Sequence, residues 1–316
     1  MRYRTLGDSG LVVSEVGLGA NNFGRTCDRE ATREVVNAAL ECGINLIDTA
    51  DIYGNRGDSE RFLGEVLKGR RDEVVLATKF GMNMQGANGP DWGARGSRRY
   101  IRRAVEASLE RLQTDYIDLY QYHEPDGITP VEETLEALNE LVAEGKVRYV
   151  GSSNFAAWQV ADADWTARSR GLTRFVSAQN HYNLLHRSAE VELLPACERF
   201  RIGVLPYFPL ANGLLTGKYR RGQPAPEGTR LARQPERLQN AAFDAIEGFE
   251  RFARERGITL LHVAFGGLLA RRAVSSVIAG ATKPEQVQAN AAAGEWAPSE
   301  EDVAALGAIT SPESLV

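Results

Sequence analysis

The chain has 316 residues, and 37 Lys and Arg against 42 Asp and Glu leave a formal net charge of -5. Its hydrophobic fraction of 43% and charged fraction of 25% are typical of globular proteins, which excludes a disordered chain or a small disulfide scaffold. An acidic chain lacks the positive surface that attracts nucleic acid or anionic membranes, so neither is expected as a partner. The three cysteines are scattered along the chain, so no structural zinc is expected. Because the sequence shows neither a signal peptide nor a long apolar run, a cytoplasmic protein is predicted.

The first dozen residues predict a β-hairpin, because Gly7 and Gly10 flank the polar pair Asp8 and Ser9. Beyond the hairpin, short apolar runs rich in β-branched residues alternate with longer stretches of helical spacing. Eight runs are strand candidates: VVSEVGLGA (12–20), INLIDTA (44–50), VVLATKF (74–80), YIDLYQYH (116–123), VRYVGSSN (147–154), FVSAQN (175–180), IGVLPYF (202–208) and VSSVIAG (274–280).

Eight strand-helix units in about 300 residues predict an α/β protein with a (β/α)8 TIM barrel, because this is the number at which a parallel sheet closes. No Pro/Ser-rich linker divides the chain, so residues 1–316 are expected to form a single domain, with the hairpin capping one end of the barrel. An open doubly wound sheet is the alternative. It would carry a G-x-G-x-x-G turn after an early strand, and the G-L-G at 17–19 lacks the third glycine.

Polar side chains follow several of the apolar runs, at the barrel face where TIM-barrel active sites lie. Asp48 ends the second run with Tyr53 just beyond, Lys79 ends the third, and His123 ends the fourth. The next two runs end in three more polar residues: Ser153, Asn154 and Gln179. An acid, a phenol, an amine and an imidazole directed at one mouth predict a proton-transfer site.

These segments resemble the aldo-keto reductase family. NLIDTADIYGNRGDSE is similar to its Asp and Tyr signature, ATKF carries its Lys, and LYQYHEPD carries its His. EGKVRYVGSSNF, SAQNHYNLL, PLANGLLTGKY and VIAGATKPEQVQAN resemble its cofactor-binding blocks in the family's order. The resemblance spans nearly the whole chain, and it implies reduction of an aldehyde or ketone with NADPH.

The resemblance places the catalytic tetrad on Asp48, Tyr53, Lys79 and His123. A phenol with a pKa near 10 is a weak acid unless a cation stabilises the phenolate, and Lys79 is expected to be that cation. Asp48 would balance the charge of Lys79, and His123 would hydrogen-bond the carbonyl oxygen. The hydride must come from the cofactor, because no side chain supplies one.

The family's cofactor positions also have matches. The carboxamide of the nicotinamide would bind Ser153, Asn154 and Gln179, and its ring would stack on Tyr207. The pyrophosphate would pass along Phe208, Pro209, Leu210, Ala211 and Asn212, and Lys218 and Arg230 would be basic residues beside the cofactor. After Gly280, Thr282 and Lys283 would meet the 2′-phosphate that distinguishes NADP from NAD, and Gln286 and Asn290 would contact adenosine. Many relatives carry Glu before the final Asn, where this chain has Ala289. The long segment 209–240 is expected to close over the cofactor.

The substrate wall is expected to include Trp92, in the glycine-rich segment after the third run, and the residues after the first run: Asn21, Asn22 and Phe23. Two other functions remain open. Some members of the family are regulatory subunits of membrane channels that sense the cofactor, with little turnover. A metal-dependent hydrolase would use His123, Glu124, Asp126 and His181, but Lys79 would then place a positive charge beside the metal, and no metal is expected.

Overall fold

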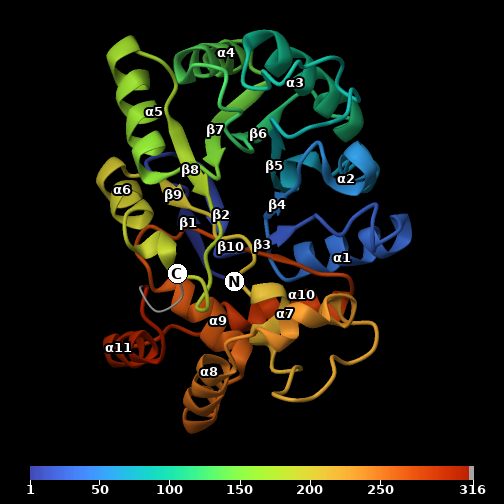
Figure 1. The fold of residues 1–316 in the computed structure, drawn as a ribbon. Helices are drawn as coiled ribbons and strands as arrows, with labels where there is room; N and C mark the ends of the chain where they lie inside the picture. The colour runs from blue at the N-terminus through green and yellow to red at the C-terminus, as the bar shows by residue number, and fades with distance from the viewer. Residues whose placement is uncertain (313–316) are drawn as a thin grey trace.

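A computed structural model describes residues 1–312, and its centre is an eight-stranded sheet of parallel strands (Figure 1). The strands follow one another around the sheet in chain order, as the alternating sequence predicts. Their bounds are β3 (Val16–Gly19), β4 (Leu46–Asp48), β5 (Val75–Phe80), β6 (Ile117–Tyr122), β7 (Val147–Ser153), β8 (Phe175–Gln179), β9 (Gly203–Val204) and β10 (Val277–Gly280).

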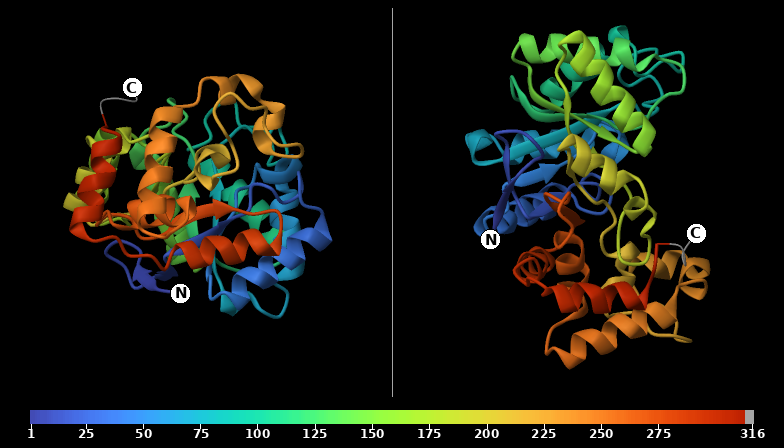
Figure 2. Two further views of the ribbon diagram at one scale, coloured as in Figure 1. Left: turned by 90° about the horizontal axis from the view of Figure 1, so that it is seen from below. Right: turned by 90° about the vertical axis from the view of Figure 1, so that its left-hand side faces the viewer.

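The first and last strands of this sheet lie side by side, because β10 pairs with β3 from Val277–Val16 to Gly280–Gly19. At the remaining seam, the β9 residue Val204 donates its N–H to the carbonyl of Ala273 (2.7 Å), and its own carbonyl accepts from Ser275 (3.0 Å). The parallel strands therefore curl into a (β/α)8 barrel. In Figures 1 and 2 the orange and red C-terminal elements accordingly lie against the blue N-terminal ones.

The predicted hairpin is present, but it extends further than expected. Strands β1 (Tyr3–Thr5) and β2 (Val12–Ser14) pair antiparallel, so the run 12–20 divides between the hairpin and β3. The division occurs where the Ser14 hydroxyl donates to the carbonyl of Val16 (2.7 Å), which turns the chain. The intervening Glu15 is buried and accepts from Arg2 (2.7 Å) and Arg4 (2.5 Å) of the first strand. These charged contacts fix the hairpin against the barrel.

Helices lie outside the strands and cover them (Figure 1). Their apolar faces repeat at helical spacing, as in α3, where Ile101, Val105 and Leu109 are buried against the sheet. The first six are α1 (Arg29–Glu41), α2 (Tyr53–Val66), α3 (Arg98–Leu112), α4 (Val131–Ala143), α5 (Ala157–Arg170) and α6 (Leu193–Phe200). The later ones are α7 (Pro235–Gln239), α8 (Phe243–Glu255), α9 (Leu260–Leu269), α10 (Pro284–Ala293) and α11 (Glu300–Ile309). No helix within residues 1–312 is long and apolar enough to cross a membrane.

The long segment after β9 is partly ordered into short turns of 3-10 helix, η3 (Ala211–Thr216) and η4 (Arg230–Arg233), followed by α7. Two further 3-10 turns, η1 (Arg71–Glu73) and η2 (Ser188–Glu190), lie elsewhere in the chain. Buried Leu215 and Leu231 join the segment to the main core. The segment is thus a packed part of the fold, and its closure over a cofactor stays a prediction.

Two layers of side chains fill the barrel. Side chains two residues apart on a strand point the same way, so Leu46, Ala77 and Leu119 form one level and Asp48, Lys79 and Gln121 form the next. The hairpin seals the apolar level from below. Its residues Leu6, Leu11 and Val13 form one buried cluster with the side chains of that level. The polar level therefore lies above an apolar floor, at the C-terminal ends of the strands.

The seal can be tested with Leu6→Ala. Leu6 is fully buried in the apolar cluster, so the truncation should lower the free energy of unfolding by about 2–5 kcal/mol in urea titration. Val12→Ala is the matched control, because Val12 lies in the same hairpin but is 46% exposed, and it should cost less than about 1 kcal/mol. Equal losses for the two variants would contradict a sealing role for Leu6.

Candidate active site

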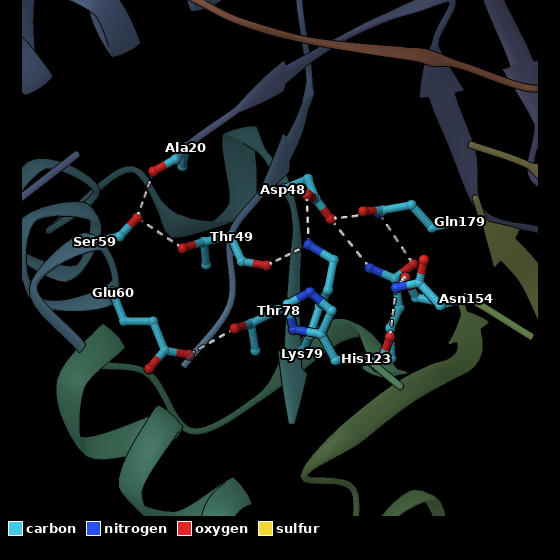
Figure 3. Close-up of polar contacts among 12 residues, drawn as sticks. Ala20, Asp48, Thr49, Ser59, Glu60, Thr78, Lys79, His123, Asn154 and Gln179 are labelled. Carbon is cyan, nitrogen blue, oxygen red and sulfur yellow. Dashed lines mark hydrogen bonds and ion pairs between the residues drawn. The ribbon is translucent and has the colours of Figure 1, made fainter. Parts of the chain in front are cut away.

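A buried ion pair between Lys79 and Asp48 lies at the centre of the polar level. Lys79 Nζ donates to Asp48 Oδ2 (2.6 Å) and to the carbonyl oxygen of Thr49 (2.8 Å) (Figure 3). The other carboxylate oxygen, Asp48 Oδ1, accepts from Gln121 Nε2 (3.1 Å) and Gln179 Nε2 (2.8 Å). Lys79 is fully buried, and a buried pair of this kind is tolerated only when its remaining polar groups are satisfied.

Tyr53 and His123 lie against this ion pair. Lys79 Nζ is 5.0 Å from the centre of the Tyr53 ring. The Tyr53 and His123 rings meet edge to face, with their centres 5.8 Å apart. The structure therefore brings together all four predicted tetrad residues, from the ends of β4, β5 and β6 and the start of α2.

The local backbone fixes Tyr53 at the mouth. The four residues after it, 54–57, all have positive φ, so the regular part of α2 begins only at Asp58. A Cβ on Gly54 would overlap the carbonyl oxygen of Phe23, so only glycine fits at that turn. Behind the turn, the Ser59 hydroxyl donates to the carbonyl of Ala20 (2.9 Å), and this bond ties α2 to the end of β3.

A second buried pair anchors α2 from behind. Glu60 accepts from the Thr78 hydroxyl (2.6 Å) and from Arg111 Nε of α3 (2.6 Å), and all three side chains are buried. Because Thr78 precedes Lys79 on β5, its side chain points to the opposite side of the strand, toward the helices. The strand therefore holds Lys79 on one side and the helix that carries Tyr53 on the other (Figure 3).

The electrostatics of the tetrad keep Tyr53 protonated. Burial raises the pKa of Tyr53; the charge of Lys79 opposes this shift, and Asp48 adds to it. Burial alone would lower the pKa of Lys79, but the neighbouring Asp48 and Tyr53 raise it overall, so Lys79 stays charged. The sequence suggested that Lys79 would make the phenol more acidic. In the structure burial outweighs that effect, because Asp48 neutralises much of the Lys79 charge.

His123 is neutral in the folded protein. Burial and the positive charge of Lys79 hold its pKa well below 6.5. Its Nδ1 is buried without a hydrogen-bond partner among the described residues, although its ring borders the mouth. A buried polar atom without a partner costs free energy, so Nδ1 of His123 has unused hydrogen-bonding capacity.

The predicted carboxamide-binding residues form a neighbouring group. Asn154 follows β7 and donates to Ser153 Oγ (3.2 Å) and to the carbonyl of His123 (3.0 Å). Its Oδ1 accepts from the Tyr207 hydroxyl (2.9 Å). Gln179, at the end of β8, joins this group to the tetrad through its bond to Asp48. These polar groups and the Tyr207 ring lie beside Lys79 and His123.

The residues predicted for the phosphate side divide into two clusters. In the first, Arg230 donates to Asn212 Oδ1 (3.3 Å), and its guanidinium lies 6.0 Å from the Phe208 ring. Of the other members, Pro209 and Ala211 are buried, Leu210 is half-buried and Lys218 is exposed.

The second cluster surrounds the turn from β10 to α10. Gln286 Oε1 accepts from the N–H of Thr282 (2.8 Å) and from its hydroxyl (3.2 Å), while Lys283 is exposed at the helix start. Gly280 precedes this turn and Asn290 lies buried on α10. A phosphate bound to Thr282 would have to displace the Gln286 side chain.

The predicted substrate residues do not share one location. Asn22 donates to the carbonyl of Ala281 (3.3 Å), and the Asn21 side chain lies beside Gly280, so both border the end of β10. Phe23 is fully buried in the core and presents no surface to the mouth. Trp92 is 71% exposed, with the guanidinium of Arg99 4.8 Å from its ring.

The sequence interpretation missed Gln121, which contacts Asp48. Gln121 lies on β6, two residues before His123, which follows the last residue of that strand, and this spacing points both side chains to the inside of the barrel. The same alternation, applied along each run, would have found it. The metal alternative finds no support: within residues 1–312, no three His, Cys, Asp or Glu side chains form a group that could hold a metal ion.

Comparison with known proteins assigns the chain to a family. The model of the aldo/keto reductase family matches residues 15–311, so the chain belongs to this family of oxidoreductases. The oxidoreductase YrpG of Bacillus subtilis (strain 168) is 39% identical over 91% of this chain and 89% of its own length. L-glyceraldehyde 3-phosphate reductase of Escherichia coli O157:H7 is 33% identical over 92% of this chain and 86% of its own length. A probable voltage-gated potassium channel subunit beta of Oryza sativa subsp. japonica is 35% identical over 92% of this chain and 90% of its own length.

The neutral state of His123 predicts a specific pH dependence of stability. Below pH 6.5 the unfolded chain binds a proton at His123 that the folded chain does not, so the free energy of unfolding should fall as the pH falls. His123→Gln removes the imidazole that binds this proton in the unfolded chain. In urea titrations from pH 7 to pH 5, the free energy of unfolding should therefore fall less for the variant than for the wild type. The difference between the two slopes should reach up to ~1.4 kcal/mol per pH unit. Parallel curves for the two proteins would mean that His123 is already charged in the folded state.

Proposed function

We propose that this protein reduces an aldehyde or ketone to an alcohol with NADPH, and that Tyr53 is the general acid. The observation that carries the proposal is the assembly of Asp48, Lys79, Tyr53 and His123 at the barrel mouth, in a chain of the aldo/keto reductase family. Three of these side chains are buried at strand ends, and titratable groups gathered in this way at one barrel mouth favour proton transfer.

The residues beside the tetrad fit a nicotinamide dinucleotide. Asn154, Ser153 and Gln179 offer amide and hydroxyl groups of the kind that bind a carboxamide, and the Tyr207 ring offers a flat face. The buried Nδ1 of His123 can be satisfied by a group bound in the mouth. When bound, the cofactor supplies the hydride that the side chains cannot.

The chain's own residues then handle the proton. The raised pKa of Tyr53 keeps its hydroxyl protonated before reaction, as a proton donor requires. As negative charge develops on the carbonyl oxygen, the phenol gives up its proton, and the Lys79 ammonium stabilises the phenolate that remains. Asp48 holds Lys79 in place, and neutral His123 directs a ring nitrogen to the carbonyl oxygen to orient it.

Tyr53→Phe tests the acid. The variant should lower the rate of NADPH oxidation with a carbonyl substrate by about 10²-fold or more, because it removes the proton donor and little else. NADPH affinity, measured by quenching of protein fluorescence, should stay near the wild-type value. Tyr3→Phe is the control, because Tyr3 lies in the hairpin and donates only to the Gly43 carbonyl. Normal turnover by Tyr53→Phe would remove Tyr53 from the mechanism.

Lys79→Met tests the stabilising cation separately. We expect a loss of turnover similar to that of Tyr53→Phe, because the phenolate would form without the neighbouring positive charge. The variant leaves the Asp48 carboxylate buried without its cation, so urea unfolding must accompany the kinetics to separate lost chemistry from lost folding. A folded variant with wild-type turnover would contradict the role of Lys79.

A preference for NADPH over NADH is the second part of the proposal. Lys283 is exposed at the start of α10, where helix N–H groups favour an anion. A 2′-phosphate there would gain a charge-assisted hydrogen bond, which contributes ~1.5–3 kcal/mol, or about 10- to 150-fold in affinity.

Lys283→Ala should therefore weaken NADPH binding and leave NADH binding unchanged. Dissociation constants for both cofactors, measured at low and high salt, should show a preference in the wild type that shrinks as salt rises. Lys68→Ala is the matched control, since Lys68 is an exposed lysine near the end of α2. Equal affinities for the two cofactors in the wild type would overturn the assignment of Thr282 and Lys283.

A second candidate function is a cofactor-sensing subunit with little turnover. Two plant relatives carry the name of a probable voltage-gated potassium channel subunit beta, and each is 35% identical over 90% of its own length. The complete tetrad favours the enzyme. The two functions separate by turnover: a protein that binds NADPH tightly but fails to oxidise it with a panel of aldehydes and ketones would favour the sensor.

A further inference from the structure

Three aromatic rings form a stacked column at the edge of the mouth. The rings of Tyr207 and His181 are within 8° of parallel, with their centres 5.5 Å apart. The ring of His186 stacks on His181, 4.0 Å away and within 16° of parallel. The tetrad uses neither histidine, and the alternative that named His181 was a metal site, which the structure does not support.

The backbone builds the column from two neighbouring segments and a tight turn. His181 and Tyr207 pair across parallel extensions of β8 and β9, where the N–H of Tyr207 donates to the Asn180 carbonyl (3.1 Å). Asn183 and His186 then exchange backbone hydrogen bonds of 3.1 and 3.0 Å, which folds the chain back on itself. This turn places the His186 ring over His181.

The column fixes the Tyr207 ring on three of its sides. His181 covers one face, Phe208 meets the ring at 82° with centres 5.2 Å apart, and the hydroxyl donates to Asn154. Phe208 has a positive φ of 53°, and its carbonyl accepts from Asn183 Nδ2 (3.0 Å). Among the described residues no aromatic ring stacks on the remaining face of Tyr207.

His181 carries no charge in this arrangement. Its Nε2 lies 3.3 Å from Asn183 Nδ2, which can only donate, so this nitrogen is unprotonated. Burial lowers the pKa of His181 to about 4, and the adjacent His186 contributes to the shift. A neutral imidazole beneath Tyr207 avoids placing a positive charge under a ring that would meet the cationic nicotinamide of the oxidised cofactor.

We propose that His181 is a positioning residue for cofactor binding: it stacks beneath Tyr207 and holds that ring in the orientation in which its other face meets the nicotinamide. The inference rests on the proposed function, because it takes Tyr207 as the stacking partner of the cofactor. His181 acts through Tyr207 and touches neither the substrate nor the cofactor.

Two substitutions separate stacking from hydrogen bonding. His181→Phe keeps a flat ring but removes the acceptor for Asn183, whereas His181→Gln keeps an acceptor but removes the ring. The dissociation constant for NADPH, measured by quenching of protein fluorescence, should rise about 5- to 10-fold for His181→Gln, the scale of one aromatic pair. It should stay within about twofold of wild type for His181→Phe. The opposite order would overturn the proposal, because the hydrogen bond would then be the determinant.

A second experiment removes the Tyr207 ring, through which His181 is proposed to act. In a Tyr207→Ala background, His181→Gln should change NADPH affinity by less than about twofold. An unchanged 5- to 10-fold effect there would overturn the proposal. His262→Gln is the matched control, because His262 caps the start of α9 through Thr259 and takes no part in the column. Urea unfolding of every variant identifies any loss that comes from folding.

Measurements on the wild-type protein distinguish the proposed function from the role of His181. A wild type that binds no nicotinamide dinucleotide overturns the proposed function and this inference with it. A wild type that binds NADPH, together with a His181→Gln variant that binds it equally well, overturns only the role of His181.

Discussion

The Lys79–Asp48 ion pair is the interaction on which the site depends. Two opposite charges are buried inside the barrel, and that burial is tolerable only because three further polar groups complete their hydrogen bonding: the Thr49 carbonyl, Gln121 and Gln179. Gln121 and Gln179 reach Asp48 from β6 and β8, so four strands must be in register for the pair to exist. The charge of Lys79 in this pair also acts on the pKa of Tyr53 and of His123, although burial is the larger cause for both residues.

Much of the architecture could be predicted because the barrel strands lie in apolar runs, and several of these runs end in polar residues. Asp48, Lys79 and His123 were found at run ends, and the structure brings them together. Gln121 was missed because it stands inside its run, where only the alternation of side chains shows which way it points. The division of 12–20 between two sheets depends on the Ser14 side chain bonding the backbone, which no pattern of hydrophobicity records.

Other features arise from contacts between distant segments. The stack of His181 on His186 requires a turn at 183–186, and the stack of His181 on Tyr207 requires two strand extensions to pair. Neither contact has a periodic signal in the sequence. The pKa of Tyr53 is a similar case: the residue types suggested a more acidic phenol, but the degree of burial decides the direction, and burial is a property of the assembled barrel.

The pairing of β3 with β10 constrains how the chain reaches this structure. The two strands are about 260 residues apart in the sequence, yet they are neighbours in the barrel. During synthesis β3 therefore has one edge without its partner until nearly the whole chain has been made, and contacts of such long range are slow to form. The apolar floor under the hairpin is completed just as late, because it includes Leu205 and, from β10, Ile278. The buried contacts of the hairpin are therefore complete only when the barrel closes.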